Sequence, residues 1–471
     1  MTNQEFRKYA HELVDWMADY LENLEQYPVK PPVKPGDIKA KLPHHAPEQG
    51  EAFEQIFQDF KDIIVPGMTH WQHPKYFAYF PAMNSEPSIL AEMLTATLGA
   101  QCMIWLTSPA AEELEERTMQ WLRDMLGLPQ HLTGVIQDTA STATLVALLT
   151  AREVVSDFRI NQSGWQGDEK YRIYASTQAH SSIDKAVRIA GFGIDNLIKI
   201  GVDENYAMIP SQLAQAIRQD IRDGYRPLCV VSCIGTTSST AIDPVESIAT
   251  IAKLHGLWHH VDAAYAGSAL LLPELRWMSK GLESADSFVF NPHKWMLTNF
   301  DCSAYFVRDK MALVNTFSIL PEYLKTDADK EVNNYRDWGI QLGRRFRALK
   351  LWFVIRSYGI EGLRKKIRDH IEWAQWLKTQ IEQAPDFELM APVPLNLVCF
   401  RYHPTGVDDE AELERINSNL LQNLNDSGKI FLTQTKLNGT YVLRLVGGTN
   451  HLTFEDVQEA WALVQAYAKE R

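Results

Sequence analysis

Hydrophobic residues in the first 80 positions follow two helical patterns separated by a proline-rich stretch. Over residues 53–63 the apolar side chains recur every three or four positions, which predicts a helix with one apolar face. The same spacing predicts an earlier helix over residues 5–24, with Phe6, Tyr9, Leu13, Met17, Leu21 and Leu24 on its apolar face. Residues 27–43, YPVKPPVKPGDIKAKLP, predict extended chain, because proline lacks the N–H group that a helix uses. We expect these helices to pack on the rest of the chain or on a second subunit.

From about residue 130, short apolar runs alternate with helical patterns. The helical patterns lie at 181–192, 211–224 and 244–256. This alternation, with nearly continuous apolar strands, predicts an α/β fold with a mainly parallel central sheet covered by helices on both faces. The strand candidates are YRIYAS (171–176), NLIKIGV (196–202), PLCVVSCIG (227–235), GLWHHVDAA (256–264), SFVFNP (287–292) and CSAYFVRD (302–309).

After about residue 360 the pattern predicts a separable small α+β domain. It consists of a helix over 361–383, two strands, NLVCFRYHP (396–404) and YVLRLVGG (441–448), and a final helix. A chain of 471 residues is long enough for two or three domains. We therefore predict an N-terminal helical segment at 1–80, a large domain at 81–360 and a small C-terminal domain at 361–471.

Charge and composition narrow the classes of partner. With 46 basic and 59 acidic residues the net charge is −13, which argues against nucleic acid or an anionic membrane as the main partner. No apolar run is long enough to span a bilayer, and the polar start lacks a signal-peptide core. The five cysteines show no zinc-ligand spacing, so we expect no metal site, reduced thiols and a cytoplasmic protein.

Residues with possible chemistry fall at the predicted strand ends. Lys294 follows the run SFVF, where a lysine taken alone is usually a solvated charge. Asp262 ends an earlier apolar run, and taken alone is usually a helix cap. Because ligands of parallel α/β sheets bind at the carboxyl ends of the strands, both side chains are expected to enter one crevice.

Two further features extend this set. Thr139, Ser141 and Thr142 open an apolar helix, where they either cap the helix or bind a phosphate group. No GxGxxG or GxxxxGK[ST] motif supports a nucleotide. His180 lies between a predicted strand and a predicted helix. It is either a packed or capping residue, or its imidazole stacks on a flat heterocycle. A lysine amine, a carboxylate, a stacking imidazole and a phosphate-binding helix start are the groups that pyridoxal 5′-phosphate requires.

At the level of whole motifs, the chain resembles the group II pyridoxal-phosphate decarboxylases, specifically the aromatic L-amino acid decarboxylases. This resemblance implies the type I, aspartate-aminotransferase-like fold and an obligate homodimer with shared active sites, in which the N-terminal helices embrace the partner. It also implies pyridoxal 5′-phosphate as cofactor. The motifs are HPKYFAYFP, TSPAAEELE, QAHSSIDKA, HVDAAYAGSA, NPHKW and YRDWGIQLGRRFRALKLW.

The resemblance also implies roles for individual residues. Lys294 is the lysine to which the cofactor is bonded, Asp262 is the partner of the pyridinium nitrogen, and His180 and Ala264 cover the two faces of the ring. The residues near the phosphate are Ala140, Ser141, Asn291 and His293, with Thr236 or Thr237 near the cofactor. The substrate pocket consists of Trp71, Tyr79, Phe80, Pro81 and, from the neighbouring subunit, Met103.

Tyr335 bears on the reaction outcome. Residues 324–338, LKTDADKEVNNYRDW, are polar and patternless, which predicts a mobile, solvated loop. In the family this loop closes over the partner's site and its tyrosine protonates the substrate α-carbon. Relatives with phenylalanine there form aldehydes, and some other aldehyde formers have asparagine at the position of His180. The chain has both Tyr335 and His180, which favours decarboxylation of an aromatic L-amino acid to its amine.

The possible substrates are tyrosine, DOPA, phenylalanine, tryptophan and 5-hydroxytryptophan. Ala82 stands where the family often has a hydroxyl side chain, and Met103 replaces a common phenylalanine with a more adaptable side chain. Ser357 resembles the plant subgroup that prefers phenolic substrates. The alternatives are an aromatic aldehyde synthase, a decarboxylase of acidic amino acids or histidine, and a non-catalytic scaffold.

Overall fold

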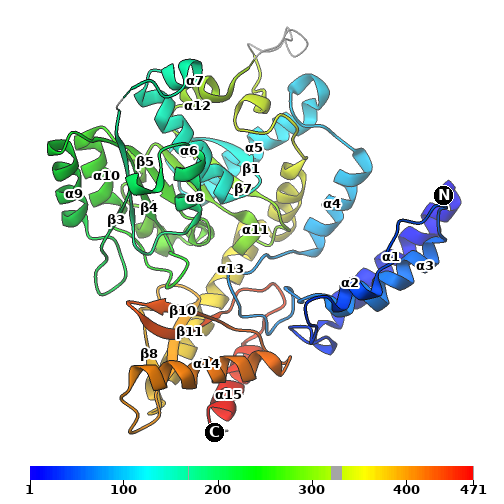
Figure 1. Ribbon diagram of the computed structural model, residues 1–471. Helices are drawn as coiled ribbons and strands as arrows, with labels where there is room; N and C mark the ends of the chain where they lie inside the picture. Colours follow the sequence, from blue (N-terminus) through cyan, green and yellow to red (C-terminus); the bar gives the residue numbers. More distant parts are fainter. Residues whose placement is uncertain (168, 320–330, 470–471) are drawn as a thin grey trace. The chain divides into compact units, whose positions relative to one another are not determined.

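The computed structural model describes residues 1–167, 169–319 and 331–469 (Figure 1). The chain forms two compact units. The terminal unit comprises Met1–Pro81, Trp373–Met390 and Val398–Arg471, and the central unit comprises Ala82–Glu372 and Ala391–Leu397. The N-terminal segment therefore clusters with the C-terminal part of the chain. Among the described residues, no helix combines the length and apolar character that crossing a bilayer requires.

The central unit is built on a seven-stranded sheet with the order β1-β7-β6-β5-β4-β2-β3. Neighbouring strands are parallel from β3 to β6, and β7 alone runs antiparallel to both of its neighbours. This arrangement confirms the predicted mainly parallel sheet. The strands are β1 (Thr133–Gln137), β2 (Tyr171–Ser176), β3 (Leu197–Ile200), β4 (Arg226–Cys233), β5 (Trp258–Asp262), β6 (Ser287–Phe290) and β7 (Ser303–Val307).

Alternate strand residues place two apolar cores on opposite faces of this sheet. In β2, Ile173 and Ala175 belong to one cluster and Tyr174 to the other. Helices α6 (Ala140–Val155) and α8 (Ser182–Ile189) pack in the first cluster, and α9 (Pro210–Arg222) and α10 (Val245–His255) pack in the second (Figure 1). The other helices of the unit are α4 (Glu86–Leu98), α5 (Pro109–Leu126), α7 (Arg159–Ser163), α11 (Pro292–Trp295) and α12 (Lys310–Phe317).

Strand β1 was not among the predicted strands. Its sequence, TGVIQ, contains only two large apolar residues, Val135 and Ile136, and merges into the hydroxyl-rich start of α6. It forms because its backbone pairs with β7, from Thr133 opposite Val307 to Gln137 opposite Ser303. Pairing with a distant strand is a tertiary effect that a short local pattern does not reveal.

In the terminal unit, α1 (Asn3–Glu22) and α3 (Phe53–Asp59) pack through aromatic rings. The ring centroids of Tyr9 and Phe53 lie 4.5 Å apart. The connection between these helices was predicted to be entirely extended, which is wrong for its second half, since α2 (Asp37–Lys41) is helical. The reason is that no proline stands between Pro35 and Pro43, and Gly36 adopts a left-handed conformation (φ 99°) that lets a new helix begin.

The C-terminal region contains a four-stranded sheet with the order β10-β11-β9-β8. The two predicted strands correspond to β9 (Leu397–Tyr402) and β11 (Thr440–Val446), whereas β8 (Phe387–Leu389) and β10 (Thr433–Leu437) are additional antiparallel partners. Helix α13 (Arg347–Gln383) has a non-helical residue, Gly359, within it. The remaining helices are α14 (Glu410–Asp426) and α15 (Phe454–Lys469).

Candidate active site

Asp262 and Lys294 follow the carboxyl ends of two neighbouring parallel strands. Asp262 is the last residue of β5, where it pairs in register with Val289 of β6. Its carboxylate is buried, and Oδ1 accepts the N–H of Ala264 at 3.0 Å. Lys294 lies in the short helix α11 that begins two residues after β6. Both residues therefore lie at the edge of the sheet where the parallel strands end.

The two side chains influence each other electrostatically. Burial lowers the pKa of Lys294, and the charge of Asp262 partly opposes this shift. A lowered pKa increases the fraction of neutral amine, which is the nucleophilic form of lysine. The two groups thus interact electrostatically at one edge of the sheet, and their roles toward a cofactor stay a prediction.

His180 follows β2 and precedes α8. Its Nδ1 accepts the N–H of Ser182 at 3.1 Å, so the neutral ring carries its proton on Nε2. Desolvation lowers the pKa of His180, the charge of Asp262 opposes the shift, and the charge of Lys294 adds to it. His180, Asp262 and Lys294 therefore share one electrostatic neighbourhood, in which the imidazole is neutral at pH 7.

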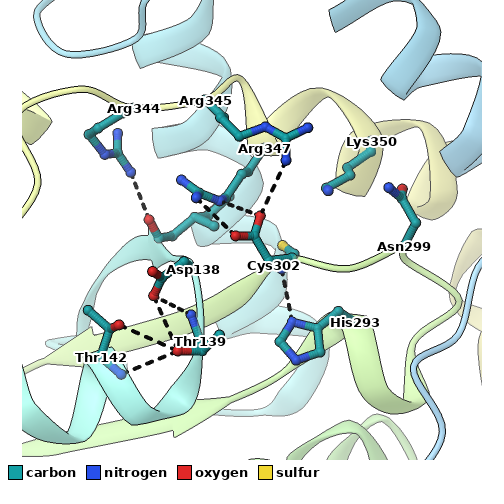
Figure 2. A network of polar contacts seen from close by, with 12 residues as sticks. Asp138, Thr139, Thr142, His293, Asn299, Cys302, Arg344, Arg345, Arg347 and Lys350 are labelled. Carbon is teal, nitrogen blue, oxygen red and sulfur yellow. Dashed lines mark hydrogen bonds and ion pairs between the residues drawn. The ribbon is translucent and has the colours of Figure 1, made fainter. Parts of the chain in front are cut away.

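Helix α6 begins at this same edge of the sheet, because β1 leads directly into it. Thr139 is its N-cap, and the hydroxyl of Thr139 accepts the N–H of Thr142 at 3.4 Å (Figure 2). Ala140 is buried and Ser141 is exposed in the first turn. The N–H groups and the positive dipole end of a 16-residue helix make this turn suitable for an anion.

Asn291 and His293 flank the proline that starts α11, and both are buried. His293 Nδ1 accepts the N–H of Cys302 at 2.9 Å, and burial lowers the pKa of His293 to about 3 (Figure 2). The ring is therefore neutral and presents an Nε2–H donor. Asn291 Oδ1 is buried without a hydrogen-bond partner in the described part of the chain. Such an unmatched polar atom indicates a group that protein atoms alone do not supply.

Thr236, Thr237 and Ala264 differ in accessibility. The hydroxyl oxygen of Thr236 is buried in its own turn, where it accepts the N–H of Ala241 at 3.1 Å and contacts the hydroxyl of Ser239 at 3.3 Å. Thr237 is partly exposed, so it is the more accessible of the two threonines. Ala264 is partly buried and packs against the core cluster that contains α6.

The four aromatic and proline residues predicted for the substrate pocket belong to the terminal unit. Trp71 and Tyr79 stack with ring centroids 6.0 Å apart, and both rings are exposed. The guanidinium of Arg444 lies over the ring of Phe80 at 5.5 Å. Trp71 and Tyr79 thus form an exposed aromatic pair, whereas Phe80 is partly buried and Pro81 is buried, and the part of these four residues in a substrate pocket stays a prediction.

The expectation of a solvated loop around Tyr335 is wrong for residues 334–338, which are buried, whereas Glu331 is exposed. Residues 324–330 of that predicted loop lie outside the described part, but Tyr335 is only 2% exposed and begins a 3-10 helix, Tyr335–Asp337. The reason is that Tyr335 and Trp338 pack together in the core cluster, with ring centroids 5.2 Å apart. The N–H of Arg336 donates to the carbonyl of Met103 at 2.9 Å. The segments of Tyr335 and Met103 therefore lie side by side.

A group of charged residues near His293 was given no role in the sequence analysis, although two of its members, Arg347 and Lys350, lie in a quoted motif. Asp301 accepts two hydrogen bonds from Arg347, at 2.9 and 3.2 Å (Figure 2). Lys350, which is fully buried, lies 3.1 Å from the carboxylate of Glu92. Asp301 directly precedes Cys302, whose N–H donates to His293, so this network holds the backbone that contacts His293. The signal in the sequence was the dense run of cations in GRRFRALK.

Residues 35–403 match the model of the pyridoxal-dependent decarboxylase conserved domain. The chain belongs to this family. It is 42% identical to tyrosine decarboxylase 2 of Narcissus pseudonarcissus over 99% of the chain and 95% of the relative. It is 43% identical to phenylacetaldehyde synthase of Arabidopsis thaliana over 99% of the chain and 96% of that relative. The crystal structure of Oryza sativa TDC with PLP and tryptamine superposes with a TM-score of 0.97 at 36% identity, over 100% of this chain and 99% of that one.

Family membership identifies the cofactor as pyridoxal 5′-phosphate and the fold as the type I fold of pyridoxal-phosphate enzymes. The residues at the sheet edge suit this cofactor. Lys294 has a lowered pKa beside a buried carboxylate, and His180 is neutral. The buried, unmatched Oδ1 of Asn291 shows that the local polar groups are not satisfied by the protein alone.

Proposed function

We propose that the chain is a pyridoxal-phosphate-dependent carboxy-lyase that converts an aromatic L-amino acid into its amine and carbon dioxide. The observation that carries the proposal is the Lys294 amine, whose pKa is lowered by burial and which lies beside Asp262 at the sheet edge. The family match and the identity to a tyrosine decarboxylase support it. Aldehyde-forming relatives have phenylalanine at the position of Tyr335 or, in some others, asparagine at the position of His180, so the presence of both residues favours the amine as product.

We propose that Lys294 binds the cofactor aldehyde, that Asp262 pairs with the ring nitrogen, and that His180 and Ala264 lie against the two faces of the ring. When bound, pyridoxal phosphate accepts the electron pair released as the bond between the α-carbon and the carboxylate breaks. The phosphate and its surroundings are assigned to Ala140, Ser141, Asn291, His293 and one of Thr236 and Thr237.

The chain's own groups then each have a defined task. The buried carboxylate of Asp262 keeps a proton on the ring nitrogen, because the opposite charges are mutually stabilising away from water. His180 contributes a neutral ring with Nε2–H as the donor toward the substrate carboxylate. Burial raises the pKa of Tyr335 well above its usual value, with the charges of Glu115 and Glu116 adding to the shift, so the phenol stays protonated. We assign the protonation of the α-carbon to Tyr335, whose side chain the structure holds in the core cluster, 2% exposed.

An aromatic aldehyde synthase is the second candidate, because phenylacetaldehyde synthase is as similar to the chain as the tyrosine decarboxylase. In that reaction the α-carbon is oxidised instead of protonated. The amino acid, dioxygen and water give the aldehyde, carbon dioxide, ammonia and hydrogen peroxide. The two reactions share the loss of carbon dioxide and differ in the fate of the α-carbon, so the products distinguish them.

The experiment is a product assay with the purified holoenzyme. Tyrosine, DOPA, phenylalanine, tryptophan and 5-hydroxytryptophan are supplied separately, and amine, aldehyde, ammonia and peroxide are each quantified. We expect one molecule of amine per carbon dioxide, with the highest rate on a phenolic substrate, as Ser357 indicates. Aldehyde formed together with ammonia and peroxide as the main product would establish the second candidate instead.

We further propose that the chain is a cytoplasmic homodimer with shared active sites. The dimer is supported by an apolar stripe on α4, where side chains three or four positions apart lie on one face and are exposed. Its members are Leu90, Met93, Leu94 and Leu98, with exposed fractions of 52%, 37%, 47% and 65%. Helix α1 also exposes Phe6 and Val14. A second copy of the chain is the partner to which we assign these faces.

A further inference from the structure

The turn that carries Lys294 continues into strained backbone. Helix α11 is only four residues long, and Leu297, two residues after its end, has a left-handed conformation (φ 52°). A leucine in this region has its side chain crowded against its own backbone, so the conformation persists only where neighbouring groups hold it. Because Leu297 is buried, that support comes from other segments of the protein.

The segment that leads into α4 contacts this turn on both sides of Lys294. The hydroxyl of Ser85 donates to the carbonyl of Leu297 at 2.7 Å. The N–H of Met83 donates to the carbonyl of His293 at 3.1 Å. One accepting carbonyl thus belongs to the residue directly before Lys294, and the other to the third residue after it. These two hydrogen bonds hold the backbone on either side of the lysine.

Ser85 is itself held in place at the N-cap of α4. It is 1% exposed, its N–H donates to the hydroxyl oxygen of Ser88 at 3.0 Å, and the Ser88 hydroxyl donates to the carbonyl of Ser85 at 2.8 Å. The start of a 13-residue helix therefore presents the Ser85 hydroxyl to Leu297. Removing this hydroxyl would take a donor away from a buried carbonyl, which is costly.

The position of this backbone matters for the amine because the side chain of Lys294 is long. A lysine has a flexible four-carbon stem, and holding such a stem in one arrangement costs conformational entropy. A turn that is fixed on both sides of the lysine removes the backbone part of this freedom before the amine reacts. The amine can then reach a bound aldehyde at a smaller entropic cost.

We propose that Ser85 is a positioning residue, whose hydroxyl holds the left-handed turn after Lys294 so that the amine is placed to bond to the cofactor aldehyde. The inference rests on the proposed role of Lys294. In the bonding step the amine nitrogen forms a C=N bond to the aldehyde carbon, and the aldehyde oxygen leaves as water with the two amine protons. Ser85 acts on this step and not on the docking of the ring and phosphate.

The test compares two ligands on the full-length chain after its cofactor has been removed by dialysis. Pyridoxal 5′-phosphate can bond to the lysine, whereas pyridoxine 5′-phosphate has an alcohol in place of the aldehyde and can only dock. For Ser85→Ala we expect the affinity for pyridoxal 5′-phosphate, titrated by absorbance, to fall about tenfold, the usual weight of one buried hydrogen bond. The affinity for pyridoxine 5′-phosphate, measured by calorimetry, is expected to change by less than about twofold.

Two variants serve as controls. Ser85→Thr keeps the hydroxyl and is expected to bind pyridoxal 5′-phosphate as the wild type does. Thr150→Val removes a different buried hydroxyl of the central unit, which donates to the carbonyl of Val146 at 2.8 Å within α6, and should leave both affinities unchanged. If Ser85→Thr does not fold, Ser85→Ala measured with both ligands carries the decision.

The outcomes separate this inference from the function on which it rests. If Lys294→Ala binds pyridoxal 5′-phosphate with wild-type affinity and absorbance, the proposed role of Lys294 fails. If Lys294→Ala loses them but Ser85→Ala binds as the wild type does, the inference about Ser85 alone is overturned. An equal loss of affinity for both ligands in Ser85→Ala also overturns it, because the hydroxyl then supports docking in general. Adding Ser85→Ala to Lys294→Ala should change nothing further, because Ser85 acts only through Lys294.

Discussion

Lys294 combines an amine of lowered pKa with a position in the short helix α11, just after strand β6. We expect Lys294→Ala to lose the visible absorbance of the bound cofactor and to reduce turnover by about 10³-fold or more, because no other group takes over the covalent bond. The measurement is the absorbance spectrum together with amine formation. Lys366→Met is the control, since Lys366 is also a lysine of the central unit whose pKa is lowered by burial, and it lies outside the site. A Lys294 variant with full absorbance and turnover would refute the assignment.

In the proposed reaction, Tyr335 is the group that protonates the α-carbon. Replacing it with phenylalanine keeps the ring beside Arg344 and Trp338 and removes only the hydroxyl. We expect amine formation to fall by about 10²- to 10⁴-fold, the usual contribution of a general acid, and aldehyde to become the main product. Separate quantification of amine, aldehyde and peroxide checks this outcome. Unchanged amine output would remove the proton-donor role.

The sequence indicated the positions of those site residues that follow directly from the order of the strands. Asp262, Lys294 and His180 each follow a parallel strand, so the sequence alone indicated that they would meet at one edge. The contact of Glu112 with the backbone of Tyr335 could not be found in this way, because the two residues lie more than 200 positions apart in the sequence. The same applies to the unmatched oxygen of Asn291, since only the packed structure shows that no protein group reaches it.

At the scale of elements, the loop between α11 and β7 links the charged network to His293. Asp301 is held by Arg347, and the next residue, Cys302, donates its N–H to His293. Desolvation acts to raise the pKa of Asp301, but the hydrogen bond from Arg347 and the positive charges of Arg347 and Lys350 together outweigh it, so the pKa is lowered. The carboxylate therefore stays charged down to a pH below its ordinary pKa, and the stabilisation is lost as pH falls through this lowered pKa.

Asp301→Asn removes that charge and should loosen the loop whose Cys302 N–H donates to His293. We expect the affinity for pyridoxal phosphate to fall about tenfold, which corresponds to about 1.4 kcal/mol. Dialysis followed by titration with the cofactor, monitored by absorbance, measures this change. Glu361→Gln breaks the exposed pair of Glu361 with Arg364 and is the control, because exposed pairs contribute little. Equal cofactor affinity of Asp301→Asn and wild type would show that the network does not support the site.

Elements with a strong local pattern were predicted, and elements formed by long-range pairing were not. The six predicted strands of the central sheet and the helices between them are present because their apolar periods are unambiguous. Strands β1 and β10 depend on antiparallel partners that complete their hydrogen bonds, and α2 depends on a left-handed glycine after a run of prolines. The polar sequence before Tyr335 predicted a solvated loop, but tertiary packing buries Tyr335.

For the whole molecule, the central question is whether each active site is completed by a second subunit. The family resemblance assigns the segments of Tyr335 and Met103 to the partner's site, and the structure brings these two segments together within one chain. Because these two segments lie side by side, one interface with the partner can bring both of them to its site. The exposed stripe on α4 supplies an apolar surface for such a contact.

Mixed dimers of Lys294→Ala and Tyr335→Phe chains test this sharing. If Tyr335 acts in the partner's site, a mixed dimer has one complete site, made from Lys294 of one chain and Tyr335 of the other. Random pairing makes half of the dimers mixed, so we expect about a quarter of the wild-type amine formation. Light scattering verifies the dimeric mass, and each variant alone gives the background. If Tyr335 served its own chain, neither site of a mixed dimer would be complete, and co-expression would restore no amine formation.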